Sequence, residues 1–211
     1  GFLFETIKTG DVEVKSATYV PRNYDPATKW PLIVFLHGAG ESGTDGAKQI
    51  IQGIGSAMLW NIEKWPFIVL LPQKPEMGKQ WEEYDEAVMG LLERAKKTYS
   101  VDASRIYLTG LSQGGHGSWV IGSKHPNVWA AVVPICGYGA MRPREGRKPG
   151  LKEFTGTPAD IAAGLKGIPV WAFHGGADDV VPVSASQELV DALKAADGNV
   201  KFTVYPGVNH N

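Results

Sequence analysis

Short continuous apolar runs recur along the chain, and longer segments of helical periodicity separate them. Runs of three to five apolar residues are typical of parallel strands that are covered on both faces of a sheet. The runs of this kind lie at residues 32–36, 67–71, 106–108, 131–133 and 170–173. We therefore expect the centre of the sheet to be mostly parallel.

Two other segments alternate apolar and polar residues, which predicts strands of period two. Val12–Tyr19 is closed by Pro21 and is predicted as a half-exposed strand near the sheet edge, and Val200–Tyr205 is predicted as the last strand. Helical spacing is clearest at 84–99, where one apolar face should pack on the sheet. Ser184 and Gln187 have capping-box spacing ahead of a second apolar stripe, which Gly198 ends.

This alternation of strands and helices predicts one doubly wound, mostly parallel α/β sheet with right-handed crossovers and helices on both faces. Ligands of such sheets bind at the carboxyl ends of the strands. The chain has 211 residues and no internal repeat or boundary signal, so we expect a single domain over 1–211. It starts at Gly1 without a leader, and we interpret it as a trimmed piece or a domain of a longer chain.

Composition and charge narrow the function classes. Hydrophobic residues make up 43% of the chain and charged residues 20%, which is typical of a globular protein rather than a disordered one. The net charge of -1 predicts no attraction to nucleic acid or an anionic membrane, and the apolar runs are too short to span a bilayer. Cys136 is the single cysteine, which excludes an internal disulfide and a multi-cysteine metal site. We read it as a buried, inert thiol.

Residues 110–114 read Gly-Leu-Ser-Gln-Gly, a G-x-S-x-G pattern between an apolar run and a predicted helix. A strand, a sharp turn and a helix are the setting of a nucleophile elbow, in which flanking glycines let a serine stand exposed above the sheet. Ser112 is therefore the candidate nucleophile. The alternative is a glycine-rich turn with an ordinary surface serine.

A serine hydroxyl needs a base, and the base needs a group that fixes its tautomer. His210 is the candidate base among five histidines, because it follows the last predicted strand on a turn at the carboxyl edge of the sheet. The acid is expected between serine and histidine in sequence, where Asp178 and Asp179 follow the run 170–173. We favour Asp178 and keep Asp179 as the alternative.

The oxyanion of the reaction needs fixed donors, and backbone N–H groups supply them. The amide of Gln113, directly after the nucleophile, is one candidate. The second is expected in the loop His37-Gly38-Ala39-Gly40 after the first buried strand. A phosphate-binding loop is the alternative there, but the segment matches neither a P-loop nor G-x-G-x-x-G.

Four segments together resemble the phospholipase/carboxylesterase group of α/β-hydrolases, which includes feruloyl and acetyl xylan esterases. They are 31–40, 102–115, 174–182 and 205–210. The resemblance implies an α/β-hydrolase fold, a catalytic triad of Ser112, Asp178 and His210, and oxyanion donors at Ala39 and Gln113. It favours a secreted or periplasmic location, and the reaction expected of such a triad needs no metal and no cofactor.

The expected function is hydrolysis of short-chain or aromatic carboxylic esters through an acyl-enzyme on Ser112. Residues 137–167 are polar and basic, with Arg142, Arg144, Arg147 and Lys148, so no large apolar lid is predicted. This cluster is read as a solvated loop, with an acidic polysaccharide or a phosphate as its alternative contact. Trp81 lies in a polar stretch and is predicted to border the substrate cleft.

Rival functions are a peptidase or acyltransferase on the same scaffold, because a triad names neither the acyl acceptor nor the leaving group. Another rival is a carbohydrate-binding domain that has lost catalysis, which the presence of all three triad residues argues against. The expected partner is a small or polysaccharide-linked ester. The sequence does not give the oligomeric state.

Overall fold

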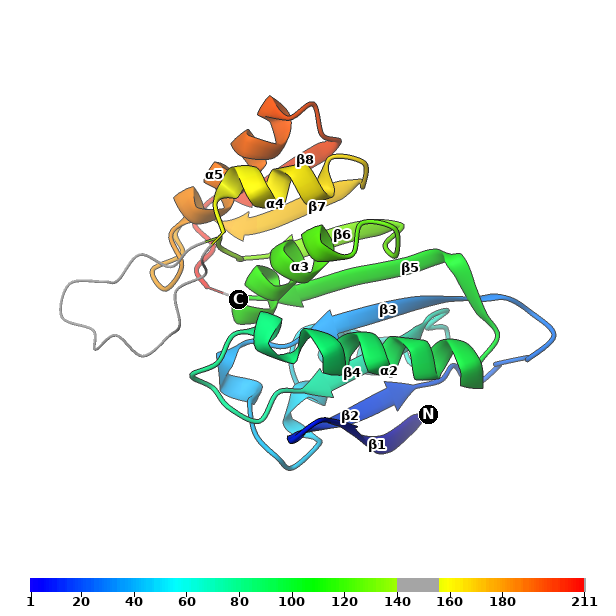
Figure 1. Cartoon of the computed structure of the whole chain (residues 1–211). Coiled ribbons are helices and arrows are strands. Elements are labelled where there is room, and N and C mark those ends of the chain that lie inside the picture. The colour runs from blue at the N-terminus through cyan, green and yellow to red at the C-terminus, as the bar shows by residue number, and fades with distance from the viewer. Residues whose placement is uncertain (140–155, 211) are drawn as a thin grey trace.

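One eight-stranded sheet organises the chain (Figure 1). The computed structural model describes residues 1–139 and 156–210. The strand order is β1-β2-β4-β3-β5-β6-β7-β8, in which β2 runs antiparallel to both of its neighbours and the remaining pairs are parallel. The strands are β1 (Phe2–Thr9), β2 (Val12–Tyr19), β3 (Trp30–Leu36), β4 (Ile68–Gln73), β5 (Val101–Leu111), β6 (Ala131–Ile135), β7 (Val170–Gly175) and β8 (Val200–Tyr205).

Every strand that the apolar pattern predicts is present, and the sheet is mostly parallel, as expected. β1 is the strand that the pattern missed. Most of its side chains are at least partly exposed, so they carry little apolar periodicity, and it is held by antiparallel pairing with β2 from Phe2↔Tyr19 to Thr9↔Val12. β1 therefore forms the outer edge beside β2.

The four longer helices pack on one face of the sheet (Figure 1). Their buried side chains join Leu32, Val34 and Leu36 of β3 in the larger hydrophobic core. This burial of apolar area is the main force that fixes the helices on the sheet. The helices are α2 (Asp85–Thr98), α3 (Gln113–Lys124), α4 (Pro158–Leu165) and α5 (Val183–Ala195).

The opposite face has a smaller core, in which Phe35, Val69 and Leu71 pack with Met58 of α1 (Ile54–Trp60). Helices thus lie on both faces, as predicted, but unevenly among the described residues. Over β7 and β8 this face carries stacked aromatic rings, with Trp171 41% and Tyr205 50% exposed.

Two local predictions differ from the structure. The capping box predicted at Ser184 does not form, because α5 begins after Pro182 without a side-chain cap. Part of the predicted loop 137–167 is the helix α4, which Thr157 caps by accepting a hydrogen bond from the amide of Asp160. The basic residues Arg142, Arg144, Arg147 and Lys148 lie outside the described residues.

In the part of the chain that the structure describes, three short 3-10 turns accompany these elements: η1 (Ala39–Glu41), η2 (Lys48–Ile50) and η3 (Trp81–Tyr84). The carboxyl ends of β3, β5 and β7 are followed by η1, α3 and the loop to α5, respectively. These are the segments in which the sequence places its candidate chemistry. Among the described helices, none has the length and apolar content needed to cross a bilayer.

Candidate active site

Ser112 occupies the turn between β5 and α3 with φ 56° and ψ -115°. A residue with a side chain rarely adopts this left-handed region, so the turn is strained. Glycines on both sides make it possible: a Cβ on Gly110 would lie 2.4 Å from the carbonyl oxygen of Gly114 and 2.5 Å from that of Leu36. The glycines of the G-x-S-x-G pattern are therefore required by close backbone contact.

Ser112, His210 and Asp178 come from three loops and meet in one chain of hydrogen bonds. His210 Nε2 lies 2.9 Å from Ser112 Oγ, and His210 Nδ1 lies 2.7 Å from Asp178 Oδ2. The carboxylate accepts the Nδ1–H proton, which leaves the Nε2 lone pair directed at the serine hydroxyl. The three residues lie 98 and 32 positions apart along the chain, and the sheet topology brings them together.

Of the two neighbouring aspartates, Asp178 is the one whose carboxylate contacts His210. Its side chain is fully buried, and its Oδ1 accepts the backbone N–H groups of Val180 at 2.9 Å and Val181 at 2.8 Å. Burial by itself would raise the pKa of Asp178, but the hydrogen bond from His210 and these two amides outweigh it, so the pKa lies below its usual value. Asp179 is exposed, and its amide donates to Asn209 Oδ1.

Two groups beside Asp178 were not predicted as part of the site. His174, at the end of β7, has its Nε2 3.2 Å from Asp178 Oδ2. The Cys136 sulfur lies within 4.8 Å of a carboxylate oxygen of Asp178 and of a ring nitrogen of His210. The thiol is buried, as expected, and burial raises its pKa to about 12, so it remains protonated at neutral pH.

The two candidate oxyanion amides lie on adjoining segments. Gln113 is the first residue of α3 and Ala39 the first residue of η1. N–H groups in the first turn of a helix have no acceptor within that helix, so they remain available to a ligand. The two segments are close, because a Cβ on Gly38 would lie 2.9 Å from a side-chain carbon of Leu111 in the elbow.

His37 and Trp81 hold the start of the Ala39 loop. Trp81 Nε1–H donates to the carbonyl of His37 at 3.0 Å, and the two rings meet edge to face at 4.9 Å. The amide of Lys74 donates to His37 Nε2 at 3.1 Å, and His37 Nδ1 lies 2.5 Å from Gly38 O. Burial lowers the pKa of His37 to about 3, so this ring stays neutral at physiological pH.

The prediction that Trp81 borders the substrate cleft is wrong for this structure. Its side chain is 0% exposed and belongs to the core, so its ring face is not available for stacking on a sugar or a phenol. The polar residues around it misled the prediction, because they lie on a 3-10 turn whose apolar side points inward. The role that its contacts support is to hold the backbone of the Ala39 loop.

Lys74 is a second support of that loop and has no recognisable sequence signal. Its ammonium group donates to Ser42 Oγ at 2.8 Å and to the carbonyl of Glu76 at 2.8 Å, and its own carbonyl accepts the amide of Gly43. Burial lowers the pKa of Lys74 to about 8. These bonds tie the segment after η1 to the end of β4.

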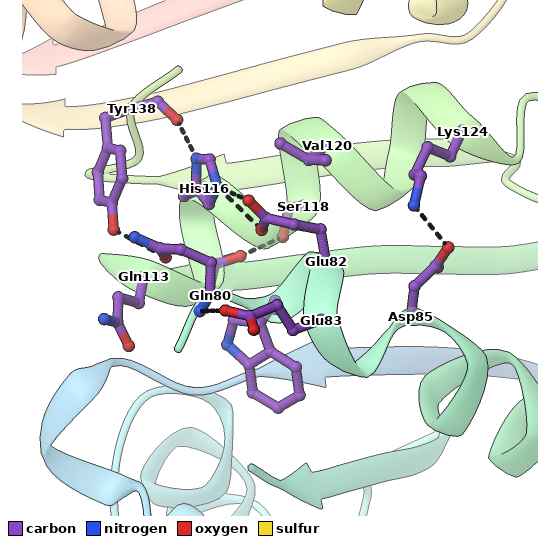
Figure 2. A network of polar contacts seen from close by, with 12 residues as sticks. Gln80, Glu82, Glu83, Asp85, Gln113, His116, Ser118, Val120, Lys124 and Tyr138 are labelled. Carbon is purple, nitrogen blue, oxygen red and sulfur yellow. Dashed lines mark hydrogen bonds and ion pairs between the residues drawn. The ribbon is translucent and has the colours of Figure 1, made fainter. Parts of the chain in front are cut away.

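A buried polar network lies behind the elbow (Figure 2). His116, on the first turn of α3, has Nδ1 2.9 Å from the carbonyl of Tyr138 and Nε2 3.1 Å from the carboxylate of Glu82. Both nitrogens of the ring therefore contact oxygen atoms that only accept hydrogen bonds. Tyr138 stacks on this ring at 4.7 Å and donates its hydroxyl proton to Gln80 at 3.1 Å.

This network joins three segments that frame the elbow: η3, α3 and the loop after β6 (Figure 2). Burial by itself would raise the pKa of Glu82, but the hydrogen bond and the charge of His116 outweigh it and leave the pKa below its usual value. Farther along α3, Lys124 and His125 contact Asp85 at 3.1 and 2.9 Å.

Solved structures share this fold. A thermostable esterase aligns with 98% of this chain and 54% of its own, with 33% identity and a TM-score of 0.78. A CE1 ferulic acid esterase from the anaerobic fungus Anaeromyces mucronatus aligns with 100% of this chain and 84% of its own, with 20% identity and a TM-score of 0.74. The second likeness is evidence of the α/β-hydrolase fold alone.

Sequence relatives cover part of the chain. A Methylorubrum extorquens protein, provisionally named a carboxymethylenebutenolidase, is 34% identical over 55% of this chain and 37% of its own length. Poly(3-hydroxyalkanoate) depolymerase C of Paucimonas lemoignei is 26% identical over 85% of this chain and 46% of its own. The chain thus spans less than half the length of these curated relatives.

The family match includes the elbow and both of its hydrogen-bonded partners. Residues 73–211 match the Dienelactone hydrolase family, which is more than half of the chain. The matched segment holds Ser112, Asp178 and His210, whereas Ala39 precedes it. On this match the chain belongs to the dienelactone hydrolase family, with an α/β-hydrolase fold.

Proposed function

We propose that the chain is a serine carboxylesterase that hydrolyses short-chain or aromatic carboxylic esters through an acyl-enzyme on Ser112. The observation that carries the proposal is the continuous hydrogen-bonded chain from Ser112 Oγ through His210 to the buried carboxylate of Asp178. A strained serine on an elbow, a neutral imidazole in the correct tautomer and an ionised acid are the parts that nucleophilic acyl transfer requires.

In the first half-reaction His210 Nε2 takes the proton of Ser112 as the serine oxygen attacks the ester carbonyl. Asp178 keeps Nδ1 protonated and stabilises the imidazolium that forms. The tetrahedral intermediate then expels the alcohol, which leaves with the proton that His210 returns. Water repeats the same steps on the acyl-enzyme and releases the acid. The side chains supply all the proton transfers, so the proposed reaction uses neither a metal nor a cofactor.

The amides of Ala39 and Gln113 are the proposed donors to the oxyanion of this intermediate. Gln113 is the first residue of α3, where the first turn of a helix favours negative charge, and Ala39 is the first residue of the short turn η1. The Lys74 and Trp81 contacts keep the Ala39 loop ordered before charge develops. A preorganised donor of this kind typically contributes about a hundredfold or more to the rate.

The substrate class rests on the relatives. Feruloyl esterase B of Neurospora crassa is 28% identical over 59% of this chain. An Aspergillus flavus protein named "Probable acetylxylan esterase A" is 30% identical over 60% of this chain. Their names support an acetyl or aromatic acyl group. An Arthroderma benhamiae relative is named as a secreted protein, which supports an extracytoplasmic location for this chain.

Hydrolysis of p-nitrophenyl acetate, butyrate, octanoate and palmitate, with methyl ferulate alongside, tests the proposal. We expect activity on the short or feruloyl esters, and a fall of about 10⁴-fold or more in Ser112→Ala, with the exposed serine variant Ser104→Ala as the control. Equal rates for wild type and Ser112→Ala on every ester would overturn it. A matched anilide separates an esterase from a peptidase.

A further inference from the structure

We propose that His174 is a positioning residue of this site, which acts through Asp178 to hold its carboxylate and moderate its effect on His210. The inference rests on the proposed function and adds a fourth residue to its machinery. His174 is 1% exposed and lies at the end of β7, four positions before Asp178. It is too deeply buried to contact substrate.

The first observation is the set of groups around the Asp178 carboxylate. Its Oδ1 accepts the amides of Val180 and Val181, and its Oδ2 accepts His210 Nδ1–H at 2.7 Å. His174 Nε2 lies 3.2 Å from the same Oδ2. The carboxylate therefore accepts three hydrogen bonds, and His174 places a fourth nitrogen beside it.

The second observation fixes the proton on His174. Its Nε2 lies 2.9 Å from the carbonyl of Val181 and 3.2 Å from Asp178 Oδ2, and both of these groups only accept hydrogen bonds. Nε2 must therefore carry hydrogen, and its positive edge faces the carboxylate. The amide of Val181 donates to Asp178 Oδ1, and the carbonyl of Val181 accepts the Nε2–H group of His174. These two bonds hold the loop that carries Asp178 against the end of β7.

The third observation is that the ring itself is held in place. His174 Nδ1 lies 2.7 Å from Ser186 Oγ on α5, and Ser186 Oγ contacts the carbonyl of Gly137 at 3.0 Å. Gly137 packs in turn against Gly115 of the elbow helix: a Cβ on Gly137 would lie 2.7 Å from the carbonyl carbon of Gly115. The chain of contacts thus runs from Asp178 back to the segment that holds the nucleophile.

The titratable groups that face the pair are few. Among the described residues, His210 faces Asp178 from the turn after β8, and the Cys136 thiol faces it from the end of β6. Cys136 is uncharged at neutral pH because burial raises its pKa to about 12. The electrostatic field at His210 is therefore set by the Asp178 carboxylate, whose charge the His174 N–H group partly offsets.

The His174 N–H group is expected to disfavour the protonated form of His210. An N–H group beside Oδ2 offsets part of the carboxylate charge, and this offset weakens the attraction between Asp178 and a protonated His210. Without it, the attraction between Asp178 and the protonated imidazole is stronger, so the protonated form of His210 is favoured. Catalysis needs the neutral imidazole, and the acid limb of kcat/KM therefore moves to higher pH.

The test compares His174→Asn with His174→Gln. The glutamine amide nitrogen is as many bonds from Cβ as Nε2 is, so it can still donate at that position, whereas the asparagine amide nitrogen matches Nδ1. We expect His174→Asn to lower kcat by about 10- to 100-fold with little change in KM and to shift the acid limb upward. His174→Gln should keep kcat within about fivefold and keep the wild-type limb.

Three further variants make the outcome decisive. His125→Asn, at a half-buried histidine bound to Asp85, should retain the wild-type profile. Ser186→Ala frees the ring and should shift the limb in the same direction as His174→Asn but by less, and it serves if His174→Asn does not fold. A wild-type acid limb in both His174→Asn and Ser186→Ala would overturn the inference. Ser112→Ala is assayed in parallel, because its retained activity would overturn the proposed function instead.

Discussion

A Cβ atom on Gly114 would lie 1.8 Å from the carbonyl oxygen of Leu36. The first turn of α3 is thus pressed directly onto the end of β3, and there is no space for a side chain between them. This contact sets the position of the elbow relative to the Ala39 loop, which begins directly after β3 ends.

Gly114→Ala is predicted to disrupt the elbow. The methyl group must displace the backbone of β3 or α3, and we expect a loss of about 3 kcal/mol or more in the free energy of unfolding, or failure to fold. Denaturant unfolding measures this. Gly90→Ala is the matched control: Gly90 is exposed on α2 with Ile7 Cγ2 4.0 Å from the added carbon, so it should gain about 0.5–1 kcal/mol.

Asp178→Asn is predicted to remove most of the activity while the fold remains. An amide in place of the carboxylate no longer fixes the His210 tautomer, for which a loss of about 10⁴-fold in kcat is expected. Asp179→Asn is the control and should stay within a few-fold of wild type. Steady-state kinetics on a p-nitrophenyl ester separates the two. Equal losses in both variants would contradict the assignment.

Glu82→Gln is predicted to weaken the network behind the elbow in a pH-dependent way. The native pKa of Glu82 lies below its unfolded value, so its contribution to stability is present above the unfolded pKa and is lost as the pH falls through the native pKa. At pH 7 the variant should lose about 2 kcal/mol.

Denaturant unfolding of wild type and Glu82→Gln between pH 7 and pH 3 tests this prediction. The difference between the two proteins should shrink as the pH falls below about 4.5, the unfolded value. Glu188→Gln, at an exposed glutamate on α5, should stay within about 0.5 kcal/mol at every pH. A difference that is constant with pH would show that Glu82 does not act through its charge.

Lys74→Met is predicted to lower kcat by about tenfold without a comparable rise in KM, because the loop after η1 loses its bond at Ser42 and the Ala39 amide loses its fixed position. Hydrogen exchange should show faster exchange in residues 39–46. Lys79→Met is the control, since the Lys79 side chain is 42% exposed and pairs with Glu76 on the surface. Unchanged exchange with lowered kcat would contradict the loop explanation.

The order of the elements could be predicted from the sequence because buried strands and one-sided helices leave clear periodicities. The apolar runs at 67–71 and 170–173 each fall on a strand. β1 could not be found this way, since its stability comes from pairing with β2 rather than from an apolar face. The cap of α5 was misjudged because Ser184 has the right spacing but lies inside the helix.

Within the candidate site, motifs predicted some residues and gave no signal for their neighbours. The elbow has a short pattern, so Ser112 could be proposed with His210 and Asp178, and the fold brings these three residues together. Cys136 approaches Asp178 because β6 and β7 are adjacent in the sheet, whereas His174 lies only four positions before Asp178 and has no motif that marks the contact. The pair of His116 and Glu82 joins residues 34 positions apart, and no periodicity records such a contact. Trp81 was misplaced because local polarity concealed its burial.

Covalent labelling shows whether Ser112 is the nucleophile. The protein is treated with a fluorophosphonate, the intact mass is measured, and the modified peptide is mapped in wild type, Ser112→Ala and Cys136→Ala. We expect one adduct on Ser112, loss of ester hydrolysis in proportion to labelling, no adduct in Ser112→Ala and normal labelling in Cys136→Ala. An adduct on another residue that tracks the loss of activity, or full activity after Ser112 is modified, would contradict this expectation.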